Sequence, residues 1–279
     1  MTATVTLPDG TAVPALGQGT WHMGEDAAAR AAEVYALQAG IDHGLTLIDT
    51  AEMYGSGGAE RVTGQAIAGR RDEVFLVSKV FPHNADLKRM RAACQASLQR
   101  LGTDCIDLYL LHWPGGVPLA DTLAGFERLR DDGLIRRWGV SNFDVGGMRD
   151  WFDLPGGSAC ATDQVLYHLG SRGIEYDLLP WCRDQALPVM AYCPLGQGRG
   201  PLQDARLQRL AAEADMSPAQ LMLAWVMRNK DVIAIPKAGT LDHVADNAGA
   251  AGLQLAPETL AALETCFPPP TRKQALDIV

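Results

Sequence analysis

The chain has 279 residues and a mass of 29.9 kDa, with 47% hydrophobic and 20% charged residues. This balance is typical of a globular protein and excludes a disordered, collagen-like or coiled-coil chain. The 24 Lys and Arg are outnumbered by 33 Asp and Glu, which gives a formal net charge of −9. We therefore expect neither a nucleic-acid partner nor an anionic-membrane partner.

A β-hairpin is predicted at the start, with strands at residues 4–7 and 11–14 around the turn Pro8-Asp9-Gly10. Eight short runs rich in Val, Ile, Leu and Tyr follow, which is the pattern of buried parallel strands. In chain order these runs are residues 16–20, 45–49, 74–79, 106–111, 137–140, 162–167, 188–192 and 232–235.

Longer segments with helical spacing lie between these runs, at residues 26–43, 87–101, 119–132 and 217–228. Ser217 followed by Pro218 is typical of a helix start, and Gly133 of a helix stop. Eight alternating strand and helix units predict an α/β protein, a (β/α)₈ TIM barrel in a single domain over residues 1–279. The N-terminal β-hairpin would close one end of that barrel. An open doubly wound sheet is the alternative, although no GxGxxG follows the first strand.

No targeting or membrane segment is apparent in the sequence. The N-terminal MTATVTLPDG lacks the basic start and apolar core of a secretory signal, and no apolar run approaches the roughly 20 residues of a membrane helix. The six cysteines include no CxxC pair, which indicates reduced thiols rather than disulfides or a zinc ribbon. We therefore expect a cytoplasmic protein.

Reactive side chains gather where the predicted strands end, which is the face that carries the active site in barrels of this kind. They are Asp49, Tyr54, Lys79, His112, Trp113, Ser141, Asn142, Gln164, Tyr192 and Lys237. Each alone has a plain structural explanation, such as a helix cap for Asp49 or a core position for His112. Together they form a cluster whose members must pair, because burying them unpaired costs several kcal/mol.

Four of these residues suggest a proton donor. A tyrosine phenol has a pKa of about 10, and the Lys79 ammonium, held by Asp49, is expected to lower the pKa of Tyr54. His112 would orient a carbonyl, so that Tyr54 serves as a general acid. No Ser or Cys nucleophile stands beside a base, so hydride transfer from a cofactor fits. A metal-dependent hydrolase or lyase is a weaker alternative, because only Asp49 and His112 qualify as ligands.

Seven motifs resemble the aldo-keto reductase family over essentially the whole chain. They are DTAEMYG (49–55), VSKV (77–80), LYLLHWPG (108–115), GVSNF (139–143), DQVLYH (163–168), AYCPLG (191–196) and IPKAGT (235–240). The resemblance implies NADPH-dependent reduction of aldehydes and ketones, and the first motif with the last is similar to a bacterial branch that includes methylglyoxal reductases. That branch implies small aldehydes and dicarbonyls as substrates. The alternatives are NADP-dependent oxidation of a secondary alcohol and a cofactor-binding module with little turnover.

The resemblance also assigns roles to individual residues. The catalytic tetrad would be Asp49, Tyr54, Lys79 and His112, with Tyr54 as acid in reduction and base in oxidation. The cofactor would contact Gly19, Thr20, Asp49, Ser141, Asn142, Gln164, Tyr192, Pro194, Leu195, Gly196, Gln197, Pro236, Lys237, His243, Asp246 and Asn247. The substrate pocket would be walled by Trp21, Phe81, Trp113 and Phe143, and no metal is implied.

Three positions depart from the family pattern. Asp163 stands where many members have Asn, and Cys193 replaces a frequent Ser. His243 stands where members often have Arg, and an imidazole binds phosphate less reliably than a guanidinium. NADP(H) stays the expected cofactor, with NAD(H) as a weaker alternative and a preference that is reduced or depends on pH. The short C-terminal tail implies an open, tolerant pocket, and we expect a monomer or weak homo-oligomer.

Overall fold

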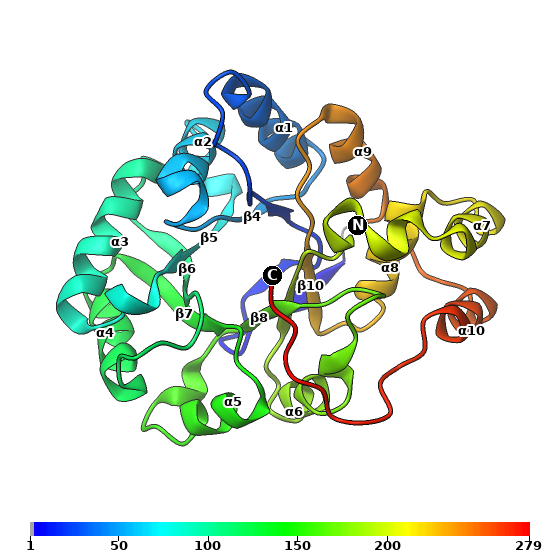
Figure 1. The fold of residues 1–279 in the computed structure, drawn as a ribbon. Coiled ribbons are helices and arrows are strands. Elements are labelled where there is room, and N and C mark those ends of the chain that lie inside the picture. The colour runs from blue at the N-terminus through cyan, green and yellow to red at the C-terminus, as the bar shows by residue number, and fades with distance from the viewer. Residues whose placement is uncertain (1–2) are drawn as a thin grey trace.

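The computed structural model describes residues 3–279, in which eight parallel strands form a barrel inside a ring of helices (Figure 1). The strands are β3 (Gln18–Gly19), β4 (Leu47–Asp49), β5 (Phe75–Val80), β6 (Ile106–Leu111), β7 (Ile135–Ser141), β8 (Asp163–Leu166), β9 (Val189–Tyr192) and β10 (Val232–Ile235). They pair in chain order, and bridges from Leu16 to Ala234 and from Gly19 to Lys237 join the first strand to the last. The predicted (β/α)₈ barrel is confirmed.

Closure of the barrel depends on a small residue in β3. A Cβ atom at Gly19 would lie 2.8 Å from the carbonyl oxygen of Ile235, so a larger side chain would push β3 away from β10. This close approach also brings the chain after Gly19 to the same end of the barrel as Lys237.

The helices cover the outside of the barrel. They are α1 (Arg30–Asp42), α2 (Gly58–Ala66), α3 (Leu87–Leu101), α4 (Leu119–Asp131), α5 (Val145–Phe152), α6 (Leu178–Asp184), α7 (Ala205–Glu213), α8 (Pro218–Val226), α9 (Leu241–Gly249) and α10 (Pro257–Cys266). Helix α3 has the predicted bounds, and α8 begins with a capping box between Ser217 and Gln220. Helix α1 begins at Arg30, later than expected, because the Asp26 carboxylate accepts the Ala28 N–H at 2.8 Å and holds a turn there.

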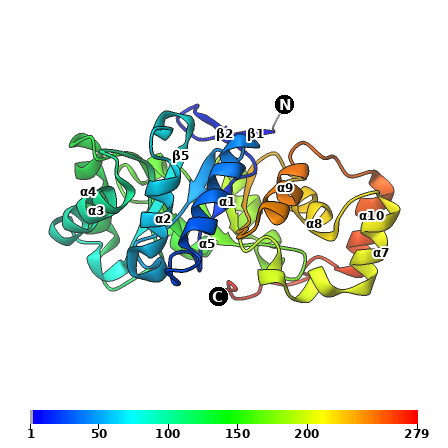
Figure 2. The same ribbon diagram turned by 90° about the horizontal axis from the view of Figure 1, so that it is seen from above.

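The N-terminal hairpin, β1 (Thr4–Thr6) and β2 (Ala12–Pro14), lies across one end of the barrel. Its Val5 and Val13 are buried and belong to the same apolar cluster as Leu47, Val77 and Leu108 of the strands. The hairpin therefore closes this end, as predicted, and leaves the opposite end for a ligand. Figure 2 shows the hairpin and the C-terminus at opposite ends.

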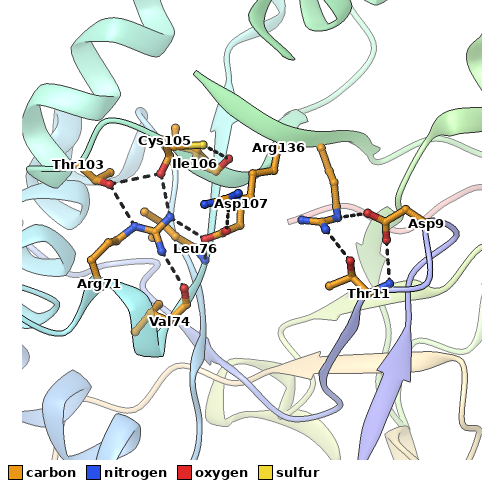
Figure 3. A network of polar contacts seen from close by, with 11 residues as sticks. Asp9, Thr11, Arg71, Val74, Leu76, Thr103, Cys105, Ile106, Asp107 and Arg136 are labelled. Atoms are coloured by element: carbon orange, nitrogen blue, oxygen red, sulfur yellow. Dashed lines mark hydrogen bonds and ion pairs between the residues drawn. The ribbon is translucent and has the colours of Figure 1, made fainter. Parts of the chain in front are cut away.

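Ion pairs reinforce the closed end (Figure 3). Arg137 of β7 donates to the Asp9 carboxylate of the hairpin turn at 2.5 Å. Nearby, the Arg71 guanidinium donates to Asp107 at 2.6 Å, and the same carboxylate oxygen accepts the Leu76 N–H at 2.9 Å. These ion pairs join the strands to the neighbouring turns and therefore stabilise the closed end of the barrel.

Two findings concern the whole described chain. All six cysteines are free thiols. Within residues 3–279, no helix combines the length and the apolar character that crossing a membrane requires.

Candidate active site

A cleft of about 1190 Å³ opens at the end of the barrel away from the hairpin. Its walls come from the C-terminal ends of the strands and the loops after them, as expected for this fold, together with parts of α8, α9 and the C-terminal tail. The predicted residues that line it are Gly19, Thr20, Trp21, Asp49, Tyr54, His112, Trp113, Ser141, Asn142, Gln164, Tyr192, Pro194, Leu195, Gln197, Pro236, Lys237, His243, Asp246 and Asn247. The volume exceeds the range of typical pockets for drug-sized ligands, so a molecule as long as a dinucleotide has room here.

Asp49 and Tyr54 form the floor of the cleft, and Lys79 of β5 lies beneath them with its side chain completely buried. Its ammonium donates to Asp49 Oδ2 at 2.7 Å, to the Thr50 carbonyl at 2.9 Å and to the Tyr54 hydroxyl at 3.2 Å. All three N–H donors of the ammonium are thereby used. Because the Tyr54 oxygen accepts from Lys79, the phenol's own proton is free to be donated elsewhere.

The protonation of the floor is set mainly by burial. Burial raises the pKa of Asp49 and lowers the pKa of Lys79, and the contact between the two charges opposes both shifts. Burial first, and then the Asp49 carboxylate, raise the pKa of Tyr54 well above its ordinary value. The expectation that Lys79 lowers this pKa is therefore wrong for the protein chain by itself. Asp49 cancels the field of the ammonium, and the buried phenol keeps its proton.

His112 stands beside Tyr54, with the two ring centroids 5.6 Å apart in an edge arrangement. Burial, and then the nearby Lys79, lower the pKa of His112 to about 2. The imidazole is therefore neutral at physiological pH. Its Nδ1 atom is buried and has no hydrogen-bond partner among the described residues. A neutral ring can offer one N–H to a polar ligand without competing with Tyr54 as the acid.

Amide and hydroxyl groups form a connected set above this floor. Gln164 Nε2 donates to Asp49 Oδ1 at 2.8 Å, across the barrel from β8 to β4. The Tyr192 hydroxyl donates to Asn142 Oδ1 at 2.9 Å, and Ser141 Oγ donates to the Gln164 carbonyl at 2.7 Å. Asn142 has a φ of 61°, a left-handed conformation that Asn tolerates better than most residues and that is common at functional sites. These amide and hydroxyl groups can donate hydrogen bonds to, and accept them from, a planar amide group of a ligand.

The part of the cleft beside Lys237 and the first turn of α9, which we call the anion-binding arm, suits an anion. Thr240 caps α9 by accepting the His243 N–H at 3.3 Å, and the first turn of this helix directs N–H groups outward. The Lys237 ammonium lies over the adjoining turn, since a Cβ at Gly239 would be 3.1 Å from its Nζ. A helix N-terminus with a lysine beside it is a favourable site for a phosphate.

Besides Lys79, four residues singled out from the sequence lie outside the lining of the cleft. Phe143 is only 1% exposed and packs against Trp151, with centroids 5.9 Å apart, so its assignment as a pocket wall is wrong. Phe81 lies outside the lining and contacts Trp113 edge-on at 5.8 Å. Gly196 faces the ring of His168 instead of the cleft.

The fourth residue, Asp163, points away from its neighbour Gln164, because successive side chains of β8 alternate in direction. It is fully buried, and burial raises its pKa well above the ordinary value. The Asp163 carboxyl group therefore does not line the ligand cleft.

Several lining residues were not predicted as contacts, among them His22, Met53, Cys193, Arg199, Ile278 and Val279. The last two belong to the C-terminal tail, which reaches the centre of the barrel face (Figure 1). Ser171 donates to the Asp277 carboxylate at 2.5 Å and fixes the tail there. The short tail, from which an open pocket was expected, therefore contributes to the wall of the cleft. No local pattern in the sequence signals this contact, which depends on where the tail runs. Within residues 3–279, no group of three potential metal-binding side chains comes together.

Comparison with known proteins agrees with this geometry. The chain matches the model of the aldo/keto reductase family over residues 15–267. It is 56% identical to the methylglyoxal reductase YeaE of Escherichia coli (strain K12) over 96% of this chain and 95% of that protein. It is 34% identical to an aldo-keto reductase of Mycolicibacterium smegmatis over 95% of this chain and 94% of the relative. The crystal structure of an aldo/keto reductase from Klebsiella pneumoniae, in complex with NADP and acetate, covers 100% of both chains with a TM-score of 0.98 and 55% identity.

Proposed function

Since the chain belongs to the aldo/keto reductase family, we propose that it reduces small aldehydes and ketones with NADPH, with Tyr54 as the general acid. The observation that carries this proposal is the contact of 3.2 Å from the Lys79 ammonium to the Tyr54 oxygen. This contact leaves the phenol proton available to a carbonyl oxygen in the cleft. Asp49 and the Thr50 carbonyl hold the ammonium in place on its other side.

The residues in the cleft fit an extended dinucleotide. Ser141, Asn142 and Gln164 would hold the carboxamide of the nicotinamide, and Tyr192 would lie against its ring. Lys237 and the first turn of α9 would hold a phosphate at the other end. When bound, the cofactor supplies the hydride that reduces the carbonyl carbon.

Three side chains of the protein, His112, Tyr54 and Lys79, would each have a separate role in the reduction. The neutral imidazole of His112 would donate to the carbonyl oxygen and orient it toward Tyr54. Tyr54 would then give its proton to that oxygen, and the phenolate oxygen that remains would keep the hydrogen bond from the Lys79 ammonium. The reverse reaction, oxidation of an alcohol, would use the same groups with Tyr54 as base.

The proposed substrates are small carbonyl compounds, including dicarbonyls of the methylglyoxal type. Trp21, Trp113 and Met53 give the substrate end an apolar wall, and Ile278 of the tail limits its width. The name of the Escherichia coli relative supports the same substrate class.

Consumption of NADPH with methylglyoxal and a panel of aromatic aldehydes tests the proposal. Tyr54→Phe should lower kcat by at least about a hundredfold, the usual contribution of a general acid. Tyr35→Phe, an exposed tyrosine of α1, is the matched control. Retention of the parent rate by Tyr54→Phe would contradict the assigned acid. Tight NADPH binding without turnover on any aldehyde would instead favour a cofactor-binding module.

A further inference from the structure

One charged side chain of the cleft has no role in the site described above. Arg199 lies between two short 3₁₀ turns, η6 (Gly196–Gly198) and η7 (Gly200–Gln203), and it lines the cleft. The neighbouring arginines of the chain, Arg183 and Arg206, are paired with aspartates at 2.8 and 2.7 Å. Within residues 3–279, no ion pair to Arg199 is found, so its guanidinium is available to a ligand.

The loop that carries Arg199 is unusual in its backbone. Gly196, Gln197, Gly198 and Gly200 all have positive φ values, of 59°, 57°, 73° and 58°. Glycine adopts this conformation without strain. The N–H groups of Gly196 and Gly198 donate to carbonyls within the loop, and a Cβ atom at Gly198 or Gly200 would meet no other atom within 4 Å, so the loop surface is uncovered there. The loop can therefore approach a phosphate closely while Arg199 supplies the charge.

The position of the loop brings Arg199 to the anion-binding arm. The turn η7 packs against α8, and α8 packs against α9, whose first turn lies beside Lys237. Leu202 of the same turn and Pro218 of α8 line the cleft together with Arg199. The loop thus forms the rim of the cleft on the side of the helix N-terminus.

The cleft offers few cationic side chains to an anionic ligand. Lys237 and Arg199 are the lysine and the arginine among the lining residues that the structure describes. Asp246 adds negative charge to the same wall. In a chain with a formal net charge of −9, an anionic ligand gains attraction only from such local donors.

We propose that Arg199 binds a phosphate of the dinucleotide cofactor from the rim of the cleft. The inference rests on the proposed function and adds a contact to it. A guanidinium binds phosphate through two parallel N–H donors, which neither the Lys237 ammonium nor the His243 imidazole can provide. The phosphate is either the 2′-phosphate or the pyrophosphate, and the two are distinguished by cofactor choice.

Calorimetric titration of the purified full chain with NADPH, NADH and 2′,5′-ADP tests this contact. Arg199→Gln should raise the Kd for NADPH at least about tenfold, as expected for loss of a charged hydrogen bond. Arg199→Lys should fall between parent and Arg199→Gln, because lysine keeps the charge and loses the paired donors. Arg149→Gln is the control, since Arg149 is exposed on α5, across the barrel from α9 (Figure 1).

The cofactors separate the possible outcomes. A loss for NADPH and 2′,5′-ADP with no loss for NADH would assign Arg199 to the 2′-phosphate, and an equal loss for NADPH and NADH would assign it to the pyrophosphate. If Arg199→Gln binds both cofactors as tightly as Arg149→Gln does, the contact is absent and the proposed function stands. If the parent protein binds neither cofactor, the proposed function itself fails, and this inference fails with it.

Discussion

Acid should destabilise the folded protein through His112. Burial and the nearby Lys79 lower the pKa of this imidazole to about 2, whereas a histidine in an unfolded chain has a pKa of about 6.5. Below pH ~6.5 the imidazole of His112 therefore takes up a proton in the unfolded chain but not in the folded protein. The stabilising contribution is fully present above that value and is lost as the pH falls, by about 1.4 kcal/mol for each pH unit. Between about pH 7 and pH 5 the loss from this residue is about 2 kcal/mol.

Urea unfolding of the parent and of His112→Gln at these two pH values measures the effect. The variant should lose about 2 kcal/mol less than the parent on acidification, because its residue 112 does not titrate. His43→Gln, a change at an exposed histidine, controls for the removal of a histidine as such. The comparison concerns only the pH dependence, so a general destabilisation of the variant does not affect it. Equal losses in the parent and in His112→Gln would refute a buried neutral imidazole.

Three further changes probe the floor, the frame and the tail of the site. Asp49→Asn should destabilise the protein by about 3–5 kcal/mol in urea unfolding, since it leaves the ammonium of Lys79 buried without its partner; a loss below about 1 kcal/mol would show that the pair is open to solvent. Ser217→Ala removes the cap of α8 and should cost about 1–2 kcal/mol by the same measurement, and an unchanged midpoint would mean that the cap is not formed. Asp277→Ala releases the tail from Ser171 and should change KM for apolar aldehydes more than the Kd for NADPH; equal effects on both would contradict a wall that faces the substrate.

The parts of the site that could be predicted follow from the order of the strands. Parallel strands place all their C-terminal ends on one face, so residues at the ends of separate strands meet whatever their distance in the sequence. Asp49 and Gln164 are 115 positions apart in the chain, yet they are in contact at 2.8 Å. Lys79 reaches Asp49 in the same way, because β4 and β5 are neighbours. These contacts depend only on recognising the strands and their order.

The parts that could not be predicted depend on the path of the chain after each strand. Phe143 is the second residue after β7 and was expected in the cleft. Asn142, between them, has a left-handed conformation, and the Phe143 ring packs against Trp151. Ile278 lies in the cleft because a tertiary contact, Ser171 to Asp277, holds the tail. A sequence pattern gives the elements and their order, whereas such turns and contacts are decided by packing. The pKa of Tyr54 was predicted to be lowered by Lys79, and this direction was wrong for a related reason. Burial of the phenol raises its pKa, and Asp49 cancels the charge of Lys79.

The floor and the rim of the cleft therefore differ in charge. At the floor, Asp49 neutralises Lys79 within a buried pair, and the neutral forms of Tyr54 and His112 are the stable ones. A floor without net charge suits the transfer of a proton to an uncharged carbonyl, because no group there competes with the phenol for the proton. The cations that an anionic cofactor needs stand at the rim, where water reaches them and burial costs little. In a chain with a net charge of −9, this separation would let one cleft attract phosphate groups and still keep the proposed acid, Tyr54, protonated.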